Sequence, residues 1–363
     1  MKRLPAFLGA ALAAAAPHAA LAQDKVVNVY NWSDYIDTST VDAFTKETGI
    51  RVVYDVYDSN EILETRLLAG GSGYDVVVPS AEYMARQIEA GVFQKLDPAK
   101  LPNLKNMWPL ITERVAAYDP GNAYSVNYMW GTTGVGYNVA KVKAILPDAP
   151  VDSWALVFDP KYAEPLSKCG IDMLDAPGEI IPAALRYLGL DPDARDAETI
   201  GKAEELLMKV RPFIRRFHSS EYINALANGD ICVAVGFSGD VFQARDRAAE
   251  AGAGVEIAYA IPKEGAMMWF DQMVVPTDAP HVDAAHQFID YLMRPDVIAK
   301  ASNHTSYANG NLASQPLIEP KIIQDSAIYP DAATLATLFT KKPYDARSQR
   351  LVTRAFTTVK TGQ

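Results

Sequence analysis

Short apolar runs alternate with amphipathic stretches over the N-terminal part of the chain. Val26–Tyr30 is a β-branched and aromatic run that predicts a buried strand, and Val41–Thr48 has apolar residues at helical spacing before Gly49. Alternating strands and helices are typical of a doubly wound α/β sheet, which is the fold class that we predict. The alternation continues with strands at 50–57 and 74–78 and helices at 62–68 and 81–90.

Residues 124–135 differ from this pattern, because they are rich in Tyr, Thr, Gly and Trp. We predict an extended segment that is broken at Gly131 and Gly134 and crosses between two lobes, since glycines absorb backbone changes at a hinge. A second α/β unit is predicted over residues 141–255. The sequence further predicts a buried strand at 231–235, a strand at 255–261 that returns towards the first lobe, a strand at 273–275, a helix at 280–293 and only short helices beyond Pro295.

The first 22 residues have the pattern of a secretory signal peptide. Lys2 and Arg3 give a positive start, Leu8–Ala16 is apolar, and Ala20–Ala22 matches a small-x-small cleavage site. The apolar run ends at Pro17 and is too short for a membrane anchor. We therefore expect an exported protein that is not inserted in the membrane after removal of residues 1–22.

About 340 residues then remain, a length that favours two domains over one. We predict a first lobe of residues 23–134 plus 257–310 and a second lobe of residues 135–256 plus 311–363. Hydrophobic residues make up 49% of the chain, which is enough for a sizeable core in each lobe.

The balance of charge argues against one class of partner. Without Lys2 and Arg3, 32 basic residues face 44 acidic ones, which gives a formal charge of −12. Nucleic-acid binding needs a basic footprint, so we expect no nucleic-acid partner.

The chain contains two cysteines, Cys169 and Cys232. In a cytosolic protein, two such cysteines would be interpreted as unrelated buried thiols. In an exported chain an even number of cysteines favours a disulfide, which we therefore predict.

Three segments share one signature, an aromatic residue close to a carboxylate near a predicted strand. They are Trp32–Tyr35, Phe237–Phe242 and Trp269–Asp271, and none contains a Lys or Arg. Residues two apart in extended backbone share a face, so the Trp and Asp of the first and third segments are expected to point the same way. Phe237 and Asp240 would meet across a turn.

A ring beside a carboxylate suits an organic cation. A carboxylate hydrogen bond to an ammonium contributes about 1.5–3 kcal/mol net, and an aromatic face adds roughly 0.5–2 kcal/mol by cation–π attraction. Each methylene buried between aromatic walls would add about 0.8 kcal/mol. A structural interpretation stays open for each segment, since Asp34 could form a turn, Asp240 could cap a helix and Trp269 could lie in the core.

Other kinds of site have weaker support. Gly70–Gly73 lacks the Lys-Ser/Thr of a phosphate loop, the mature histidines lack metal-ligand spacing, and no Gly-x-Ser-x-Gly elbow is present. We therefore expect that the protein is not an enzyme and that it binds no metal and no cofactor. The alternatives are a receptor for amino acids or for a bound metal, and a secreted enzyme; an amino-acid site would need an Arg for the α-carboxylate.

Five motifs carry a resemblance to a known family. They are Trp32-Ser-Asp-Tyr35, Arg215-Arg-Phe-His-Ser-Ser-Glu-Tyr-Ile-Asn224, Leu226-Ala-Asn-Gly-Asp-Ile-Cys232, Gly239-Asp-Val241 and Ile261-Pro-Lys-Glu-Gly-Ala266. From Lys25 to the C-terminus the chain resembles periplasmic polyamine-binding proteins, the putrescine and spermidine receptors of ABC importers. The resemblance implies the two-lobe periplasmic binding protein fold (type II-like), with doubly wound sheets joined by crossover strands and closing at a hinge. It also implies a polyamine ligand, an inner-membrane ABC permease as partner, a periplasmic location and a monomer.

The resemblance assigns roles to individual residues. Three carboxylates would take the ammonium groups, five rings would enclose the ligand, and four further side chains would add polar contacts. Cys169 and Cys232 fall where relatives have a disulfide. The carboxylates are Asp34, Asp240 and Asp271; the rings are Trp32, Tyr35, Phe237, Trp269 and Tyr307; the further residues are Ser33, Ser80, Glu179 and Ser219.

Three positions depart from the family pattern or add to it. Phe237 stands where relatives often have Trp. Trp269 stands where putrescine receptors tend to have Phe and resembles spermidine receptors instead. Glu82, near the expected pocket mouth, could meet an extra amine or begin a helix. The choice between putrescine and spermidine therefore stays open.

Overall fold

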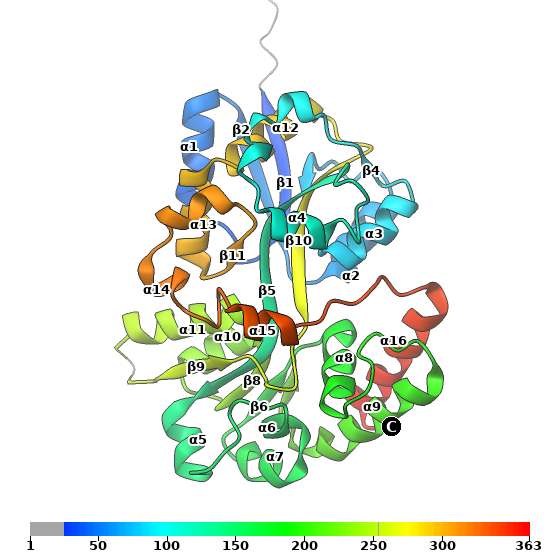
Figure 1. Ribbon diagram of the computed structural model, residues 1–363, viewed down its shortest axis with the longest axis vertical. Helices are drawn as coiled ribbons and strands as arrows, with labels where there is room; N and C mark the ends of the chain where they lie inside the picture. The colour runs from blue at the N-terminus through cyan, green and yellow to red at the C-terminus, as the bar shows by residue number, and fades with distance from the viewer. Residues whose placement is uncertain (1–24, 253) are drawn as a thin grey trace, which may run out of the picture.

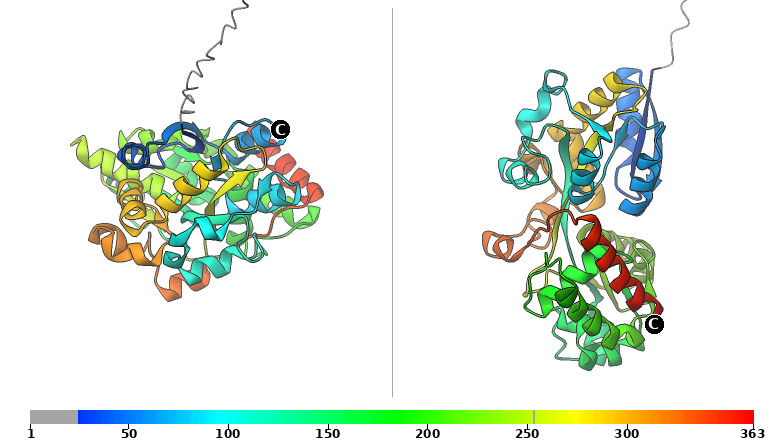
Figure 2. Two further views of the ribbon diagram at one scale, coloured as in Figure 1. Left: turned by 90° about the horizontal axis from the view of Figure 1, so that it is seen from above. Right: turned by 90° about the vertical axis from the view of Figure 1, so that its right-hand side faces the viewer.

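The computed structural model describes residues 25–252 and 254–363 (Figure 1). The predicted signal peptide lies outside these residues. Two lobes follow one another along the longest axis, and strands β5 (Ser125–Asn138) and β10 (Met268–Pro276) run from one lobe into the other (Figure 1 and Figure 2). No helix in this described part is long and apolar enough to cross a bilayer.

The first lobe is built around β1 (Val26–Trp32), which lies between two parallel neighbours, β2 (Arg51–Tyr57) and β3 (Val76–Val77). Strand β3 pairs antiparallel with β10, so the sheet is mixed. Alternate residues of β1 are buried, as expected for a strand with a core face. The connecting helices confirm the predicted alternation; they are α1 (Thr38–Thr48), α2 (Asn60–Leu68) and α3 (Ala81–Glu89).

Capping residues fix the ends of these helices. Helix α1 ends at Gly49, whose φ of 69° is the left-handed conformation that glycine adopts without strain, as predicted. Helix α2 begins after Ser59, whose hydroxyl accepts a hydrogen bond from the amide of Ile62.

The crossing strand β5 is continuous over 14 residues, so the predicted break at Gly131 and Gly134 is wrong. A Cβ at Gly131 would lie 2.7 Å from the Trp269 ring, and one at Gly134 would lie 2.5 Å from the carbonyl oxygen of Ala260. These glycines allow close packing against neighbouring strands and side chains, which explains why they occur in an unbroken strand.

The predicted return at residues 255–261 is also wrong. Strand β9 (Ile257–Ala260) pairs with residues 135–138 of β5 and so stays in the second lobe. The chain returns through β10, which pairs with β5 from residue 268 to residue 274.

The second lobe has a smaller sheet on the other end of β5. Strand β8 (Val233–Phe237) pairs antiparallel with β5 and parallel with β6 (Ile171–Met173), and β6 pairs with β7 (Arg216–Phe217). The predicted strand at 231–235 is found two residues later. Helices surround this sheet: α5 (Val139–Ile145), α6 (Ala155–Phe158), α7 (Pro160–Ser167), α8 (Pro177–Tyr187), α9 (Ala197–Val210), α10 (Glu221–Ala227) and α11 (Ser238–Glu250).

A disulfide joins Cys169 and Cys232, which confirms the pairing predicted from the sequence. The two Cα atoms are 5.6 Å apart. Each cysteine precedes a strand of the second lobe, so the bond ties the start of β6 to the start of β8.

The C-terminal part contains longer helices than expected. Helix α13 (Pro295–Thr305) has 11 residues and α16 (Ala346–Thr361) has 16, so the prediction of only short helices beyond Pro295 is wrong. Helix α16 buries one face, which includes Val352 and Phe356, against α8 and α9. The remaining elements are β4 (Phe93–Gln94), α4 (Pro109–Val115), α12 (Val282–Leu292), β11 (Ala308–Asn309), α14 (Pro320–Ile323) and α15 (Ala332–Thr337).

Residues 338–345 link α15 to α16 along the junction of the lobes. The carbonyl oxygen of Lys341 accepts a hydrogen bond from Tyr118 at 2.8 Å, and that of Pro343 accepts one from Arg195 at 2.9 Å. This linker therefore contacts residues of both lobes. The lobe boundaries at residues 134 and 310 stay a prediction, whereas the one at residue 256 would assign β9 to the first lobe although β9 pairs with the second-lobe end of β5.

Candidate functional site

A pocket lies between the two lobes. It is bounded by the loop that follows β1, by the first turns of α3, α8 and α11, and by the first half of β10. Each of the twelve residues that the sequence singled out as ligand contacts lines it. They are Trp32, Ser33, Asp34, Tyr35, Ser80, Glu179, Ser219, Phe237, Asp240, Trp269, Asp271 and Tyr307.

Asp271 is a buried carboxylate on β10. Its Oδ2 accepts a hydrogen bond from the Tyr35 hydroxyl and its Oδ1 one from the Ser80 hydroxyl, both at 2.7 Å. Burial raises the pKa of Asp271 to about 7, and the negative charges of Glu82 and Asp240 act in the same direction. Each oxygen keeps a lone pair, so the carboxylate can still accept hydrogen bonds from a ligand.

Asp240 is held in the same way in the first turn of α11. Its Oδ1 accepts from Tyr307 and its Oδ2 from Tyr222, both at 2.7 Å. Burial raises the pKa of Asp240 to about 6. Gly239 makes this contact possible, because a Cβ there would lie 2.4 Å from the Tyr307 ring.

Aromatic rings form one wall of the pocket. The Trp269 ring meets Phe237 edge to face at 5.7 Å between centroids and meets Tyr307 at 5.4 Å. Trp32 is fixed by a 2.8 Å hydrogen bond from its indole nitrogen to the carbonyl oxygen of Val78. These contacts hold the rings before any ligand arrives, which lowers the entropy lost on binding.

Asp34 differs from the sequence-based expectation in two ways. Its φ of 53° puts it in a turn, so it does not share an extended face with Trp32. Its carboxylate lies 3.3 Å from the guanidinium of Arg247, although no cation lies within its own segment. Arg247 belongs to α11 of the other lobe, just beyond Phe242, and inspection of the three segments alone could not find it.

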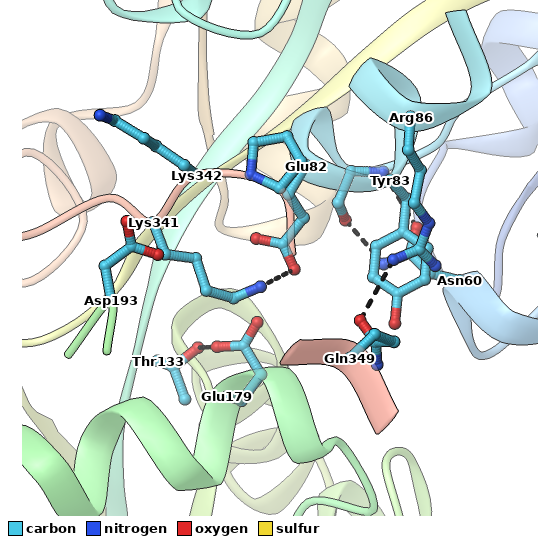
Figure 3. A network of polar contacts seen from close by, with 12 residues as sticks. Asn60, Glu82, Tyr83, Arg86, Thr133, Glu179, Asp193, Lys341, Lys342 and Gln349 are labelled. Atoms are coloured by element: carbon cyan, nitrogen blue, oxygen red, sulfur yellow. Dashed lines mark hydrogen bonds and ion pairs between the residues drawn. The ribbon is translucent and has the colours of Figure 1, made fainter. Parts of the chain in front are cut away.

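Glu179 lies in the first turn of α8, where its Oε2 accepts a 2.6 Å hydrogen bond from Thr133 (Figure 3). Burial raises the pKa of Glu179 well above its ordinary value, and the nearby charge of Glu82 adds to this effect. Ser219 lies in the turn before α10 and lines the same pocket.

Further side chains, which the sequence did not single out, position the carboxylates. Tyr222 orients Asp240, Thr133 orients Glu179, and Asn60 donates to the Ser80 hydroxyl at 3.0 Å. Tyr222 lies within the motif at residues 215–224, which was a usable signal. Thr133 and Asn60 had no signal, because their role depends on which strands and helices meet.

The carboxylates of Asp240 and Asp271 accept hydrogen bonds from hydroxyl groups alone within residues 25–252 and 254–363, and neither forms an ion pair there. The same residues contain no group of three or more His, Cys, Asp or Glu arranged to hold a metal ion. The arrangement is therefore suited to donors that a ligand brings, above all to ammonium groups.

A cleft between two α/β lobes, lined by preformed polar and aromatic groups, defines a solute-binding protein. The chain belongs to the family of bacterial extracellular solute-binding proteins, which it matches over residues 39–330. The expected two-lobed fold of periplasmic binding proteins is confirmed by this match and by similar solved structures.

Two relatives share about half of their residues with this chain. The chain is 52% identical to the putrescine-binding periplasmic protein PotF of Escherichia coli (strain K12), over 100% of this chain and 98% of that protein. It is 51% identical to the putrescine-binding periplasmic protein SpuD of Pseudomonas aeruginosa (strain UCBPP-PA14), over 94% of each. The crystal structure of the spermidine/putrescine ABC transporter substrate-binding protein PotD of Streptococcus pneumoniae superposes with a TM-score of 0.77 at 28% identity, covering 93% of this chain and 99% of that one. The resemblance to periplasmic polyamine-binding proteins is thereby confirmed.

Proposed function

We propose that this protein captures putrescine, spermidine or both in the periplasm and delivers the amine to an inner-membrane ABC permease. One observation carries the proposal. Asp240 and Asp271 are two buried carboxylates that accept hydrogen bonds from hydroxyl groups and face one aromatic pocket between the lobes. Buried negative charge without a positive partner is costly, and a cationic ligand removes that cost.

The physical basis is the one expected for a flexible diamine. Ammonium groups donate to the free lone pairs of Asp240 and Asp271, and each charge-assisted hydrogen bond contributes about 1.5–3 kcal/mol. The methylenes lie against Trp269 and Phe237, where burial of each contributes about 0.8 kcal/mol. Closure of the lobes then excludes water and strengthens each electrostatic contact.

The comparisons support the amine class and the transport role. The similar proteins are described as binding putrescine or as spermidine/putrescine substrate-binding proteins of ABC transporters, and two of them are periplasmic. We carry these properties to this chain together with export by the predicted signal peptide, a monomeric state and a role without catalysis. The twelve predicted residues that line the pocket are proposed as its ligand contacts, with Asp34 engaged by Arg247 at the pocket edge.

Calorimetric titration of amine-free protein tests the proposal. The protein is unfolded, washed and refolded to remove bound amine, then titrated with putrescine, spermidine, cadaverine and arginine. We expect one site per chain for putrescine or spermidine and weaker binding of arginine, whose α-carboxylate would face the buried acids. Tight arginine binding without polyamine binding would instead indicate an amino-acid receptor.

A further inference from the structure

An ion pair lies in the wall of the pocket at the end formed by α3 and α8. The Oε1 atom of Glu82 is 2.5 Å from Nζ of Lys341, and their side chains are 11% and 3% exposed (Figure 3). Glu82 lines the pocket, and Lys341 belongs to the linker at residues 338–345. Lys341 does not itself line the pocket, so its ammonium acts on the cleft through the carboxylate of Glu82.

The surroundings of Lys341 hold its ammonium in that place. The Tyr344 ring centroid is 4.8 Å from Nζ, and a Cβ at Gly178 would lie 3.3 Å from it. The backbone at Lys341 is fixed by the hydrogen bond from Tyr118. Because the position is enclosed on several sides, the side chain has little freedom to swing away from Glu82.

The carboxylates of the pocket form a series. Asp240 and Glu82 both raise the pKa of Asp271, and Glu82 also raises that of Glu179. Asp34, near Asp240, is already neutralised by Arg247. At the opposite end, Glu82 is neutralised by Lys341, while Asp240 and Asp271 between these two ion pairs have hydroxyl partners. Asp34 and Glu82 are thus paired with protein cations, while Asp240, Asp271 and Glu179 have hydroxyl partners alone within the described residues.

We propose that Lys341 determines the length of the amine that the cleft accepts. Its ammonium neutralises Glu82, the lining carboxylate that would otherwise be free to bind a further ligand ammonium, so the site takes a diamine in preference to a triamine. This inference rests on the proposed function. A Trp at position 269 is the residue type of spermidine receptors and would favour the longer amine, so Lys341 and Trp269 act in opposite directions. The variants below leave Trp269 unchanged.

The test is the ratio of spermidine affinity to putrescine affinity, measured by calorimetry. In Lys341→Gln the glutamine amide can still donate to Glu82, so the buried carboxylate keeps a partner while the competing positive charge is removed. We expect the ratio to rise by about tenfold or more, because a charge–charge interaction at this range is worth at least that factor. In Lys341→Gln/Glu82→Gln the freed carboxylate is absent, and the ratio is expected to return to within about threefold of the wild type.

Lys342→Gln is the matched control. Lys342 is the next residue, is exposed, and forms no ion pair within the described part of the chain, so its substitution changes the net charge equally. We expect it to leave the ratio unchanged. Circular dichroism and thermal unfolding establish that each variant is folded.

Three outcomes would overturn the inference. They are a wild-type protein that prefers spermidine, a ratio in Lys341→Gln equal to that in Lys342→Gln, and a double variant with the same raised ratio as the single one. If the wild type binds diamines and one of these results is obtained, the inference about Lys341 fails while the proposed function still stands. If it binds neither amine, the proposed function fails as well.

Discussion

Asp240 and Asp271 each accept two hydrogen bonds from hydroxyl groups, which orient the carboxylate but leave its charge uncompensated. Hydroxyl donors are weaker partners than a guanidinium or an ammonium, so the strongest partner is left for the ligand to supply. Tyr35 and Tyr307 connect the two aspartates, since their rings meet edge to face at 5.1 Å between centroids. The two carboxylates and their tyrosines are thus one packed unit.

Replacement of either carboxylate by an amide removes the charge with little change of shape. Asp240→Asn and Asp271→Asn are each expected to weaken putrescine binding at least tenfold, on the order of 2–5 kcal/mol for the loss of one partner of a buried charge pair. Asp246→Asn on the same helix is the control, because Asp246 pairs with Arg245 and does not line the pocket. Unchanged calorimetric affinity in both pocket variants would contradict the assignment.

Binding is expected to weaken as the pH falls. The pKa of Asp271 is about 7 and that of Asp240 about 6 in the amine-free protein, so protons compete with the amine below these values. Affinity should be constant above pH 8 and fall by about tenfold per pH unit for each acid that must ionise. Titrations near pH 6 in buffers of different ionisation enthalpy should detect protons released on binding. An affinity independent of pH between 5 and 8 would rule out competition between protons and the amine for these carboxylates.

The same pKa values affect stability with the opposite sign. A folded-state pKa above the unfolded value of about 3.9 means that the neutral carboxyl stabilises the fold. In amine-free protein this contribution is complete below pH 4 and is lost as the pH rises through 6 to 7. The increase in melting temperature caused by putrescine should therefore be larger at pH 8 than at pH 5.

At single positions the sequence predicted residue types well and local geometry less well. A ring beside an acid could be found by inspection, and each such pair reached the pocket. The left-handed turn at Asp34 and its contact with Arg247 could not be found, because the first depends on backbone conformation and the second on how the lobes meet.

Among the helices and strands, the start of α11 contributes most to the site. Gly239 lets the Tyr307 ring lie against the first turn, where Tyr307 donates to Asp240 and its oxygen accepts from the Asp240 amide at 3.2 Å. A side chain at Gly239 would displace the ring and leave the carboxylate with one hydroxyl donor fewer.

Gly239→Ala is accordingly expected to reduce both amine affinity and stability, the latter by about 1–3 kcal/mol for overpacking of a filled site. Gly201→Ala in α9 is the matched control, since no described atom outside its own helix lies within 4 Å of the added Cβ. The control should stabilise the protein by about 0.5–1 kcal/mol through helix propensity and leave affinity unchanged. Urea unfolding and calorimetry measure both effects, and equal results for the two variants would refute this role of Gly239.

The disulfide acts on the second lobe and not on the pocket. It closes a loop with a sequence separation of 63, for which the chain-entropy model gives about 4 kcal/mol. Cys169→Ala/Cys232→Ala should lower the unfolding free energy by about this amount, while putrescine affinity changes by less than about threefold, because neither cysteine lines the pocket. A large loss of affinity in a folded variant would show that the bond also shapes the site.

The strands and helices between residues 26 and 90 were predictable because each has a strong local pattern of apolar residues, and α1 and α2 also have a capping residue. The roles of Gly131 and Gly134 were not predictable, because a glycine in a strand indicates either a hinge or a close neighbour. Only the position of Trp269 and Ala260 on adjacent strands distinguishes these cases.

On the scale of the whole molecule, polar contacts cross the cleft on both sides of the pocket. Asp34 and Arg247 join the lobes at one edge, and Arg86 on α3 donates to Gln349 on α16 at 3.3 Å at the other (Figure 3). Partly exposed contacts of this kind are individually weak, so they permit opening and favour closure once a ligand adds its own contacts. The two-lobed architecture could be expected from the sequence, but these bridging pairs could not.

A crystal structure of the protein with putrescine would show directly whether the two buried aspartates bind the ligand. We expect one diamine in the pocket between the lobes, with ammonium nitrogens within about 3 Å of the carboxylates of Asp240 and Asp271 and with methylenes against Trp269. A diamine bound elsewhere, or one in this pocket whose ammonium groups avoid both carboxylates, would contradict it.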